Sequence, residues 1–178
     1  MSQRLPDFVD PWGLADAGKR FRGSIPLREL ERLCSALAGC DGDVEFEIAF
    51  RRDHQRRALI EGSVRASLSL QCQRCLQTMA HAVDSRFQLA VIEVADEVER
   101  IPEHCEPVQV EEGQLSPLAL IEDELLLSIP QVPKHDPSIC RIDPVLIRDD
   151  EADQDGLERE STVNPFAVLA TLKSDESN

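Results

Sequence analysis

The alternation of hydrophobic and polar residues predicts three long β-strands in the middle of the chain. Over residues 44–51, every second position is apolar and the positions between them are mostly charged, which is the pattern of a half-buried strand. The same alternation returns over residues 58–70 and again over about 79–94. Three long neighbouring strands predict an antiparallel β-meander, either curled or partly closed into a barrel that protects its edges.

Two segments have helical spacing instead and are expected to flank the meander. The first begins at Ser24 and Pro26, carries leucines three or four residues apart, and ends at Gly39. The second begins at Ser116 and ends before Pro130; its leucines and isoleucine face the core, and residues 122–124 (Glu-Asp-Glu) face water. Residues 1–23 are interpreted as an extended N-terminal arm, and residues 95–114 as a loop or short edge element. The predicted fold class is α+β.

The C-terminal part of the chain differs from the rest in composition. Residues 1–145 are predicted to form a single domain, and residues 146–163 a disordered acidic linker, because the stretch 149–160 contains seven acids and one base. Residues 164–173 predict a short helix: Asn164 can cap it, Pro165 suits its first position, and Phe166, Leu169 and Leu172 follow at helical spacing. This apolar helix docks either on its own domain or on a partner, since a helix this short forms only when packed.

Charge limits the choice of partner. The net charge is −15, and residues 1–89 carry 13 Lys and Arg against 12 Asp and Glu, whereas residues 90–178 carry 6 against 22. The acidic half repels nucleic acid and suits a basic protein such as a ribosomal protein, although such acid also serves solubility. No apolar run is long enough for a membrane span, and the N-terminus has no apolar signal region, so we expect a cytoplasmic protein without a membrane partner.

Cysteine spacing indicates a candidate zinc site. Cys72 and Cys75 form a Cys-x-x-Cys pair where the second strand turns towards the third, and His135 and Cys140 offer a nitrogen and a sulfur on a proline-rich segment. Together they would make a structural Cys3His site. The alternative is that these thiols are small structural residues; redox chemistry is disfavoured because no helix starts at the pair. The other cysteines, Cys34, Cys40 and Cys105, receive no functional role, and free thiols or metal are favoured over a disulfide framework.

A group of basic residues is a candidate RNA contact. Its members are Arg51, Arg52, Arg56 and Arg57 around the first hairpin turn, with Arg74 further along. The alternative is that these arginines pair with Glu45, Glu47 and Glu61 on neighbouring strands. The alternative is favoured, because the one aromatic neighbour, Phe50, belongs to the apolar face of its strand and is not free to stack on a base.

Catalytic signatures are absent from the sequence. It contains no Gly-x-Ser-x-Gly elbow, no phosphate-binding glycine loop and no dinucleotide fingerprint. The consecutive acids at 122–124 point apart on a helix, so they do not converge on a metal or a substrate. We therefore expect a non-enzymatic protein without a small-molecule substrate.

Several of these stretches together resemble the YceD family, the bacterial large ribosomal RNA subunit accumulation proteins. The matching pieces, in order, are Cys72-Gln73-Arg74-Cys75, Glu122-Asp123-Glu124 with Ile129-Pro130-Gln131-Val132-Pro133-Lys134-His135-Asp136, Cys140, and Asn164-Pro165-Phe166-Ala167-Val168-Leu169-Ala170 with Leu172-Lys173. The resemblance implies a ribosome biogenesis factor needed for the synthesis, processing or stability of 23S rRNA. It leaves open whether the partner is a ribosomal precursor, the large-subunit rRNA itself, or a basic ribosomal protein that the chain serves as an acidic adaptor or chaperone.

Overall fold

The computed structural model describes residues 5–110 and 112–141. The predicted acidic linker and the predicted docking helix, with Asn164, Pro165, Phe166, Leu169 and Leu172, lie outside these residues. Among the residues described, no helix is both long enough and apolar enough to cross a membrane.

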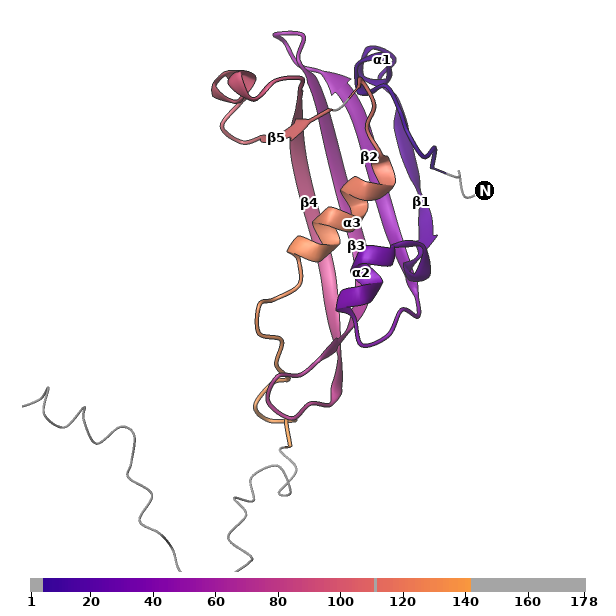
Figure 1. Ribbon diagram of the computed structural model, residues 1–178, viewed down its shortest axis with the longest axis vertical. Helices are drawn as coiled ribbons and strands as arrows, with labels where there is room; N and C mark the ends of the chain where they lie inside the picture. Colours follow the sequence, from indigo (N-terminus) through magenta and orange to yellow (C-terminus); the bar gives the residue numbers. More distant parts are fainter. Residues whose placement is uncertain (1–4, 111, 142–178) are drawn as a thin grey trace, which may run out of the picture. The chain divides into compact units, whose positions relative to one another are not determined.

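A five-stranded sheet forms the body of the fold (Figure 1). Its strands are β1 (Arg20–Pro26), β2 (Asp43–Arg52), β3 (Ala58–Gln71), β4 (Thr78–Ile92) and β5 (Glu106–Gln109). They lie side by side in sequence order; β1 to β4 are antiparallel neighbours, and β5 runs parallel to β4. The predicted α+β class and the meander of β2, β3 and β4 are confirmed. The sheet is open, so the alternative of a partly closed barrel is wrong.

The N-terminal part differs from the sequence prediction. Residues 1–23 are not an extended arm throughout, because they contain the helix α1 (Pro11–Asp16) and the start of β1. Phe21 and Ile25 are buried on one side of β1, and Arg22 between them is exposed. The predicted helix over 24–39 is reduced to the 3-10 turn η1 (Leu27–Glu29) and the short helix α2 (Glu31–Ala36). The first residues of that prediction pair with β2 instead, where strand pairing satisfies their backbone groups.

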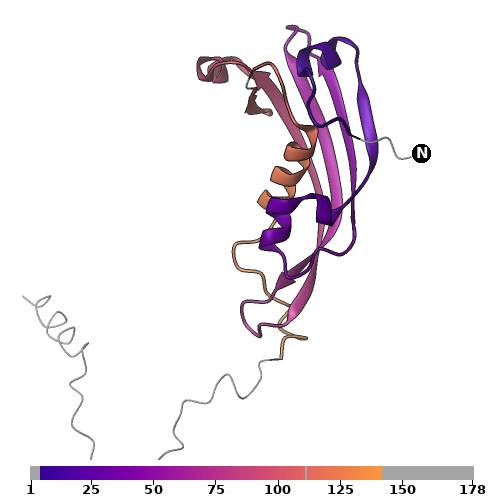
Figure 2. The ribbon, with the colours of Figure 1, turned by 45° about the vertical axis from the view of Figure 1, so that its right-hand side comes forward.

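The helices α2 and α3 (Pro117–Leu127) cover one face of the sheet (Figures 1 and 2). The core lies between this face and the helices, and it contains alternate residues of β2 and β3 together with Leu33, Ile121 and Leu125. The residues between these positions point away from the helices, so the other face of the sheet is mostly polar, except for a small apolar cluster of Leu59, Ala90 and Cys105. Before α3, the chain forms the 3-10 helix η2 (Ala95–Arg100) and β5.

One close contact in the core depends on a glycine. Gly62 on β3 lies directly opposite Phe87 on β4, and the Phe87 ring occupies the space where a side chain of residue 62 would lie. A Cβ atom added to Gly62 would stand 2.0 Å from the ring. Because residue 62 has no side chain, the Phe87 ring can lie directly over the backbone of β3.

The acidic residues of α3 do not all face water as predicted. Ser116 caps the helix as expected, its hydroxyl oxygen accepting a hydrogen bond from the Ala119 amide. Glu122, however, is buried, and its carboxylate accepts hydrogen bonds from the backbone N–H groups of Arg32 (2.7 Å) and Leu33 (3.0 Å). The Arg32 guanidinium also pairs with it at 2.8 Å. The residue at the N-cap of α2, Leu30, makes no side-chain hydrogen bond to the helix. Glu122 of α3 caps α2 in its place.

Candidate metal centre

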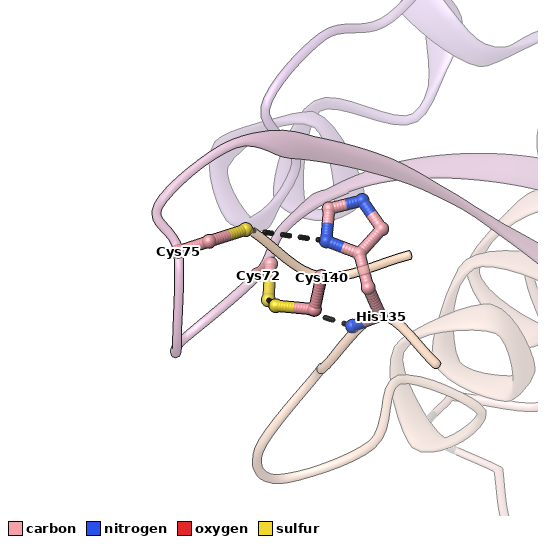
Figure 3. Close-up of side chains that lie close together, drawn as sticks. All are labelled: Cys72, Cys75, His135 and Cys140. Carbon is pink, nitrogen blue, oxygen red and sulfur yellow. Dashed lines mark hydrogen bonds between the residues drawn. The ribbon is translucent and has the colours of Figure 1, made fainter. Parts of the chain in front are cut away.

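Four side chains from two distant segments meet at one end of the sheet (Figure 3). Cys72 and Cys75 lie in the turn between β3 and β4, and His135 and Cys140 lie in the segment that follows α3. The cysteines of the turn are buried, and the other two residues are half-buried. The turn between β2 and β3 lies at the opposite end of the strands (Figure 1).

Backbone hydrogen bonds shape the Cys-x-x-Cys turn. The Cys72 amide donates to the Gln77 carbonyl at 2.9 Å, and the Leu76 amide donates to the Cys72 carbonyl at the same distance. Leu76 has a positive φ of 60°, which allows the chain to return into β4. The turn therefore directs the sulfurs of Cys72 and Cys75 to the same side, towards His135 and Cys140.

The segment after α3 is held against this turn and folds back on itself. The Gln73 amide donates to the Pro133 carbonyl at 2.8 Å, which joins the two segments. A turn at Asp136 then brings the chain back, since the Cys140 amide donates to the Asp136 carbonyl at 3.1 Å and the Asp136 carboxylate accepts from the Ser138 amide at 2.8 Å. This turn places His135 and Cys140 beside each other despite their separation in sequence.

The distances between the four ligand atoms fit a tetrahedral metal ion. All four atoms lie within 4.8 Å of one another. The sulfurs of Cys72 and Cys140 are 3.8 Å apart, and the Cys75 sulfur lies 3.3 Å from Nδ1 of His135. Tetrahedral zinc with Zn–S bonds of about 2.3 Å separates its sulfur ligands by ~3.8 Å. The donor set of three sulfurs and one imidazole suits zinc, and the described residues fit this metal.

Local hydrogen bonds favour a thiolate within the cluster. Burial alone would raise the pKa of Cys72, but hydrogen bonds from the backbone N–H groups of Cys75, His135 and Arg74 outweigh it and lower the pKa to about 5. For Cys75, the Gln77 amide acts in the same direction, yet burial and the neighbouring sulfurs prevail and raise its pKa. Negative charge on one sulfur thus disfavours ionisation of its neighbours, and a bound cation would offset this repulsion.

Arg74, a candidate RNA contact in the sequence, belongs to this cluster. Its Nε donates to the Cys140 sulfur at 3.0 Å, and its Nη2 donates to the His135 carbonyl at 3.4 Å. The hydrogen bond to the Cys140 sulfur raises the pKa of Arg74. Three thiolates on a divalent ion would leave one excess negative charge, which the Arg74 guanidinium would balance.

The other four candidate RNA contacts are placed around the turn between β2 and β3. Arg51 pairs with Glu61, as the alternative interpretation predicted, Arg52 pairs with Asp16 at 2.8 Å, and Arg57 pairs with Asp53 at 2.7 Å. Arg56 has no ion pair among the described residues. The structure also places an aromatic residue beside this group: Trp12 of α1, whose carbonyl accepts a hydrogen bond from Arg52. Trp12 could not be assigned to this group from sequence, because 40 residues separate it from Arg52.

The cysteines outside the cluster include a pair that the sequence analysis did not expect. Cys34 and Cys40 form a disulfide, because the chain turns back after α2 and brings their Cα atoms to 5.6 Å. Cys105 is a buried free thiol away from the cluster.

Comparison with known proteins agrees with the sequence resemblance. Residues 60–173 match the family described as "Large ribosomal RNA subunit accumulation protein YceD". The chain is 30% identical over 176 residues to the Large ribosomal RNA subunit accumulation protein YceD of Haemophilus influenzae, a match that covers 96% of this chain and 97% of that protein. No solved structure gives a significant match. The family match and the near full-length similarity show that this chain belongs to the YceD family.

Proposed function

We propose that this chain is a cytoplasmic, non-enzymatic ribosome biogenesis factor that large-subunit rRNA needs in order to accumulate. The observation that carries the proposal is the near full-length similarity to the Haemophilus influenzae protein of that name. The family match also spans the whole of the four-residue cluster and continues to residue 173. The family match therefore includes both the metal cluster and the segment predicted to be the C-terminal docking helix.

The cluster is proposed to be a structural zinc site. Cys72, Cys75, His135 and Cys140 would hold the metal, and zinc would supply bonds that cross-link two chain segments. Four protein ligands fill a tetrahedral site, so no position remains for a substrate or an activated water. This favours a structural role over a catalytic one.

The segment over residues 129–140 depends on this cross-link. It has no helix or strand of its own; Ile129 at its start packs against the core, but its other large apolar residues, Val132 and Ile139, are 55% and 66% exposed. Hydrophobic burial therefore contributes little to holding it in place. The cluster fixes the path of the chain between α3 and the residues beyond 141, which include the sequence proposed to dock on a partner.

The proposed function is tested by removing the protein from cells. Depletion is expected to lower the amount of free large subunits and of their rRNA relative to small subunits, as measured on a sucrose gradient and by quantifying both rRNAs. Expression of the full chain from a plasmid should restore the ratio. Unchanged subunit and rRNA ratios after complete depletion would overturn the proposal.

A second candidate is an acidic adaptor or chaperone that binds a basic ribosomal protein without touching RNA. The charge of the second half favours it, with 22 acids against 6 bases over residues 90–178. Such a complex should be sensitive to salt and survive nuclease treatment in an affinity capture. Loss of every ribosomal protein after nuclease treatment would refute it.

A further inference from the structure

A pocket of about 340 Å³ opens beside the turn between β2 and β3. It is bounded by α1, the end of β4 and η2, at the end of the sheet opposite the metal cluster. Its apolar lining includes Ala58, Val91, Ile101 and Trp12. Arginines and two acids complete the lining, so a ligand here would meet both an apolar wall and charged groups.

The arginines of the pocket fall into two kinds. Arg52 and Arg57 are held in ion pairs with Asp16 and Asp53, and Arg57 also donates to the Arg100 carbonyl. The guanidinium groups of Arg56 and Arg100 have no ion pair or hydrogen bond among the residues that the structure describes, and both side chains are exposed. These two cations are available to a ligand.

Trp12 lines the same pocket as Arg56 and Arg100. Its amide donates to the Asp10 carboxylate at 3.0 Å, and Arg52 donates to its carbonyl at 3.4 Å. The side chain is half-buried and packs against the core, and it is the only tryptophan in the chain. A fixed, partly exposed indole is a surface on which a planar base can stack at low cost in conformational entropy.

Two acids, Glu93 and Glu97, also line the pocket. Glu97 accepts a hydrogen bond from the Glu93 amide, so its position is fixed. Carboxylates accept hydrogen bonds from the amino and imino groups of bases but repel phosphate. A ligand would therefore place its phosphates towards Arg56 and Arg100 and its base towards Trp12 and the carboxylates.

We propose that this pocket binds one nucleotide unit of single-stranded RNA, with the base against Trp12 and the adjoining phosphates on Arg56 and Arg100. The inference rests on the proposed function, because it supplies the direct contact that a factor acting on rRNA would need. An acidic peptide would satisfy the two cations but would leave the indole and the apolar lining without a planar partner. A basic protein would be repelled by the same cations.

Binding can be followed through the single tryptophan. The full chain is titrated with an oligouridylate of about ten nucleotides, a length that one single-strand binding surface covers. We expect quenching of Trp12 fluorescence and an affinity that falls with salt, with a slope of about −1.4 in log K against log salt for two phosphate contacts. A polyphosphate of similar charge should bind without quenching the indole.

Variants separate the pocket from general charge. Arg56→Asn suits the positive φ of 63° at this position, and Arg100→Gln removes the charge of an exposed residue while keeping a polar side chain on η2. Each should weaken RNA binding about threefold or more and reduce the salt slope by about 0.7. Arg22→Gln removes another exposed arginine, on β1 and away from the pocket, and is the matched control, expected to bind as the unaltered chain does. Trp12→Leu should weaken binding at least about fivefold in an anisotropy assay with labelled RNA, and Trp12→Phe less.

Several outcomes would overturn the inference. They are an absence of RNA binding by the full chain, an equal loss in Arg22→Gln, full binding in a double Arg56→Asn and Arg100→Gln variant, or equally tight quenching by an acidic peptide. Failure here is distinct from failure of the proposed function. If depletion lowers large-subunit rRNA and the double variant restores it fully, the function stands and the pocket does not carry it.

Discussion

Replacing Glu122 with alanine should be among the most destabilising changes to a charged residue in this domain. Glu122 is 7% exposed, and its carboxylate accepts two backbone hydrogen bonds from the start of α2 and one from the Arg32 side chain. In Glu122→Ala the buried Leu33 amide loses its acceptor, which costs about 1–3 kcal/mol. Loss of a helix cap adds about 1 kcal/mol.

The expected total for Glu122→Ala is therefore about 3 kcal/mol of unfolding free energy. The ion pair to Arg32 adds little, because the Arg32 side chain is 54% exposed and solvent screens it. Glu122→Gln keeps one oxygen acceptor but loses the charge, so about 1 kcal/mol is expected. Asp123→Ala is the matched control: Asp123 pairs with the same arginine but is 53% exposed, and its removal should cost under about 0.5 kcal/mol.

Urea unfolding followed by circular dichroism and Trp12 fluorescence measures these differences. The midpoint should fall in the order Asp123→Ala, Glu122→Gln, Glu122→Ala, with little change in slope. Equal and small effects for Glu122→Ala and Asp123→Ala would refute the reasoning, since they would mean that the carboxylate does not cap α2.

Three further predictions concern the core, the first turn and the metal cluster. Gly62→Ala should destabilise the domain by about 2 kcal/mol, because its Cβ would collide with the Phe87 ring, and Gly62→Ala with Phe87→Leu should recover part of the loss in urea unfolding. Burial opposes ionisation of Asp53, but its hydrogen bonds with Arg57 prevail and hold its pKa below the usual value. The stability that this pair contributes is thus present near neutral pH and lost as pH falls below ~4 towards the folded-state pKa, and Asp53→Asn should lessen that acid dependence. Removal of the proposed zinc with a chelator should increase hydrogen exchange over residues 129–141 while the strands stay protected; uniform exchange throughout the chain would contradict a local cross-link.

The parts of the fold that sequence could predict are those with long regular patterns. β2, β3 and β4 have 10 to 15 residues each, and alternation over most of their length predicts both the strand and the buried face. The N-terminal elements are shorter: α1 and α2 have six residues each, too few for a helical period to show. Gly23 and Pro26 also interrupt the alternation of β1, which favoured a helix start over a strand.

In the candidate site, too, only the residues with a local sequence pattern could be predicted. Cys72, Cys75, His135 and Cys140 could be proposed because each pair has a local spacing typical of metal ligands. Arg74 could not be assigned to them, since its contacts with Cys140 and His135 arise only when the two segments meet. The same holds for Glu122 and Trp12, whose partners lie 90 and 40 residues away.

The zinc content of the purified full chain tests the proposed metal centre most directly. One zinc ion per chain is expected by elemental analysis of protein purified without chelator, and the content should fall sharply in Cys72→Ser and His135→Ala. Cys105→Ser, which alters a buried free thiol outside the cluster, should keep the full content. A chain that contains no zinc and does not take it up, or equal zinc in Cys72→Ser and Cys105→Ser, would contradict the proposed centre.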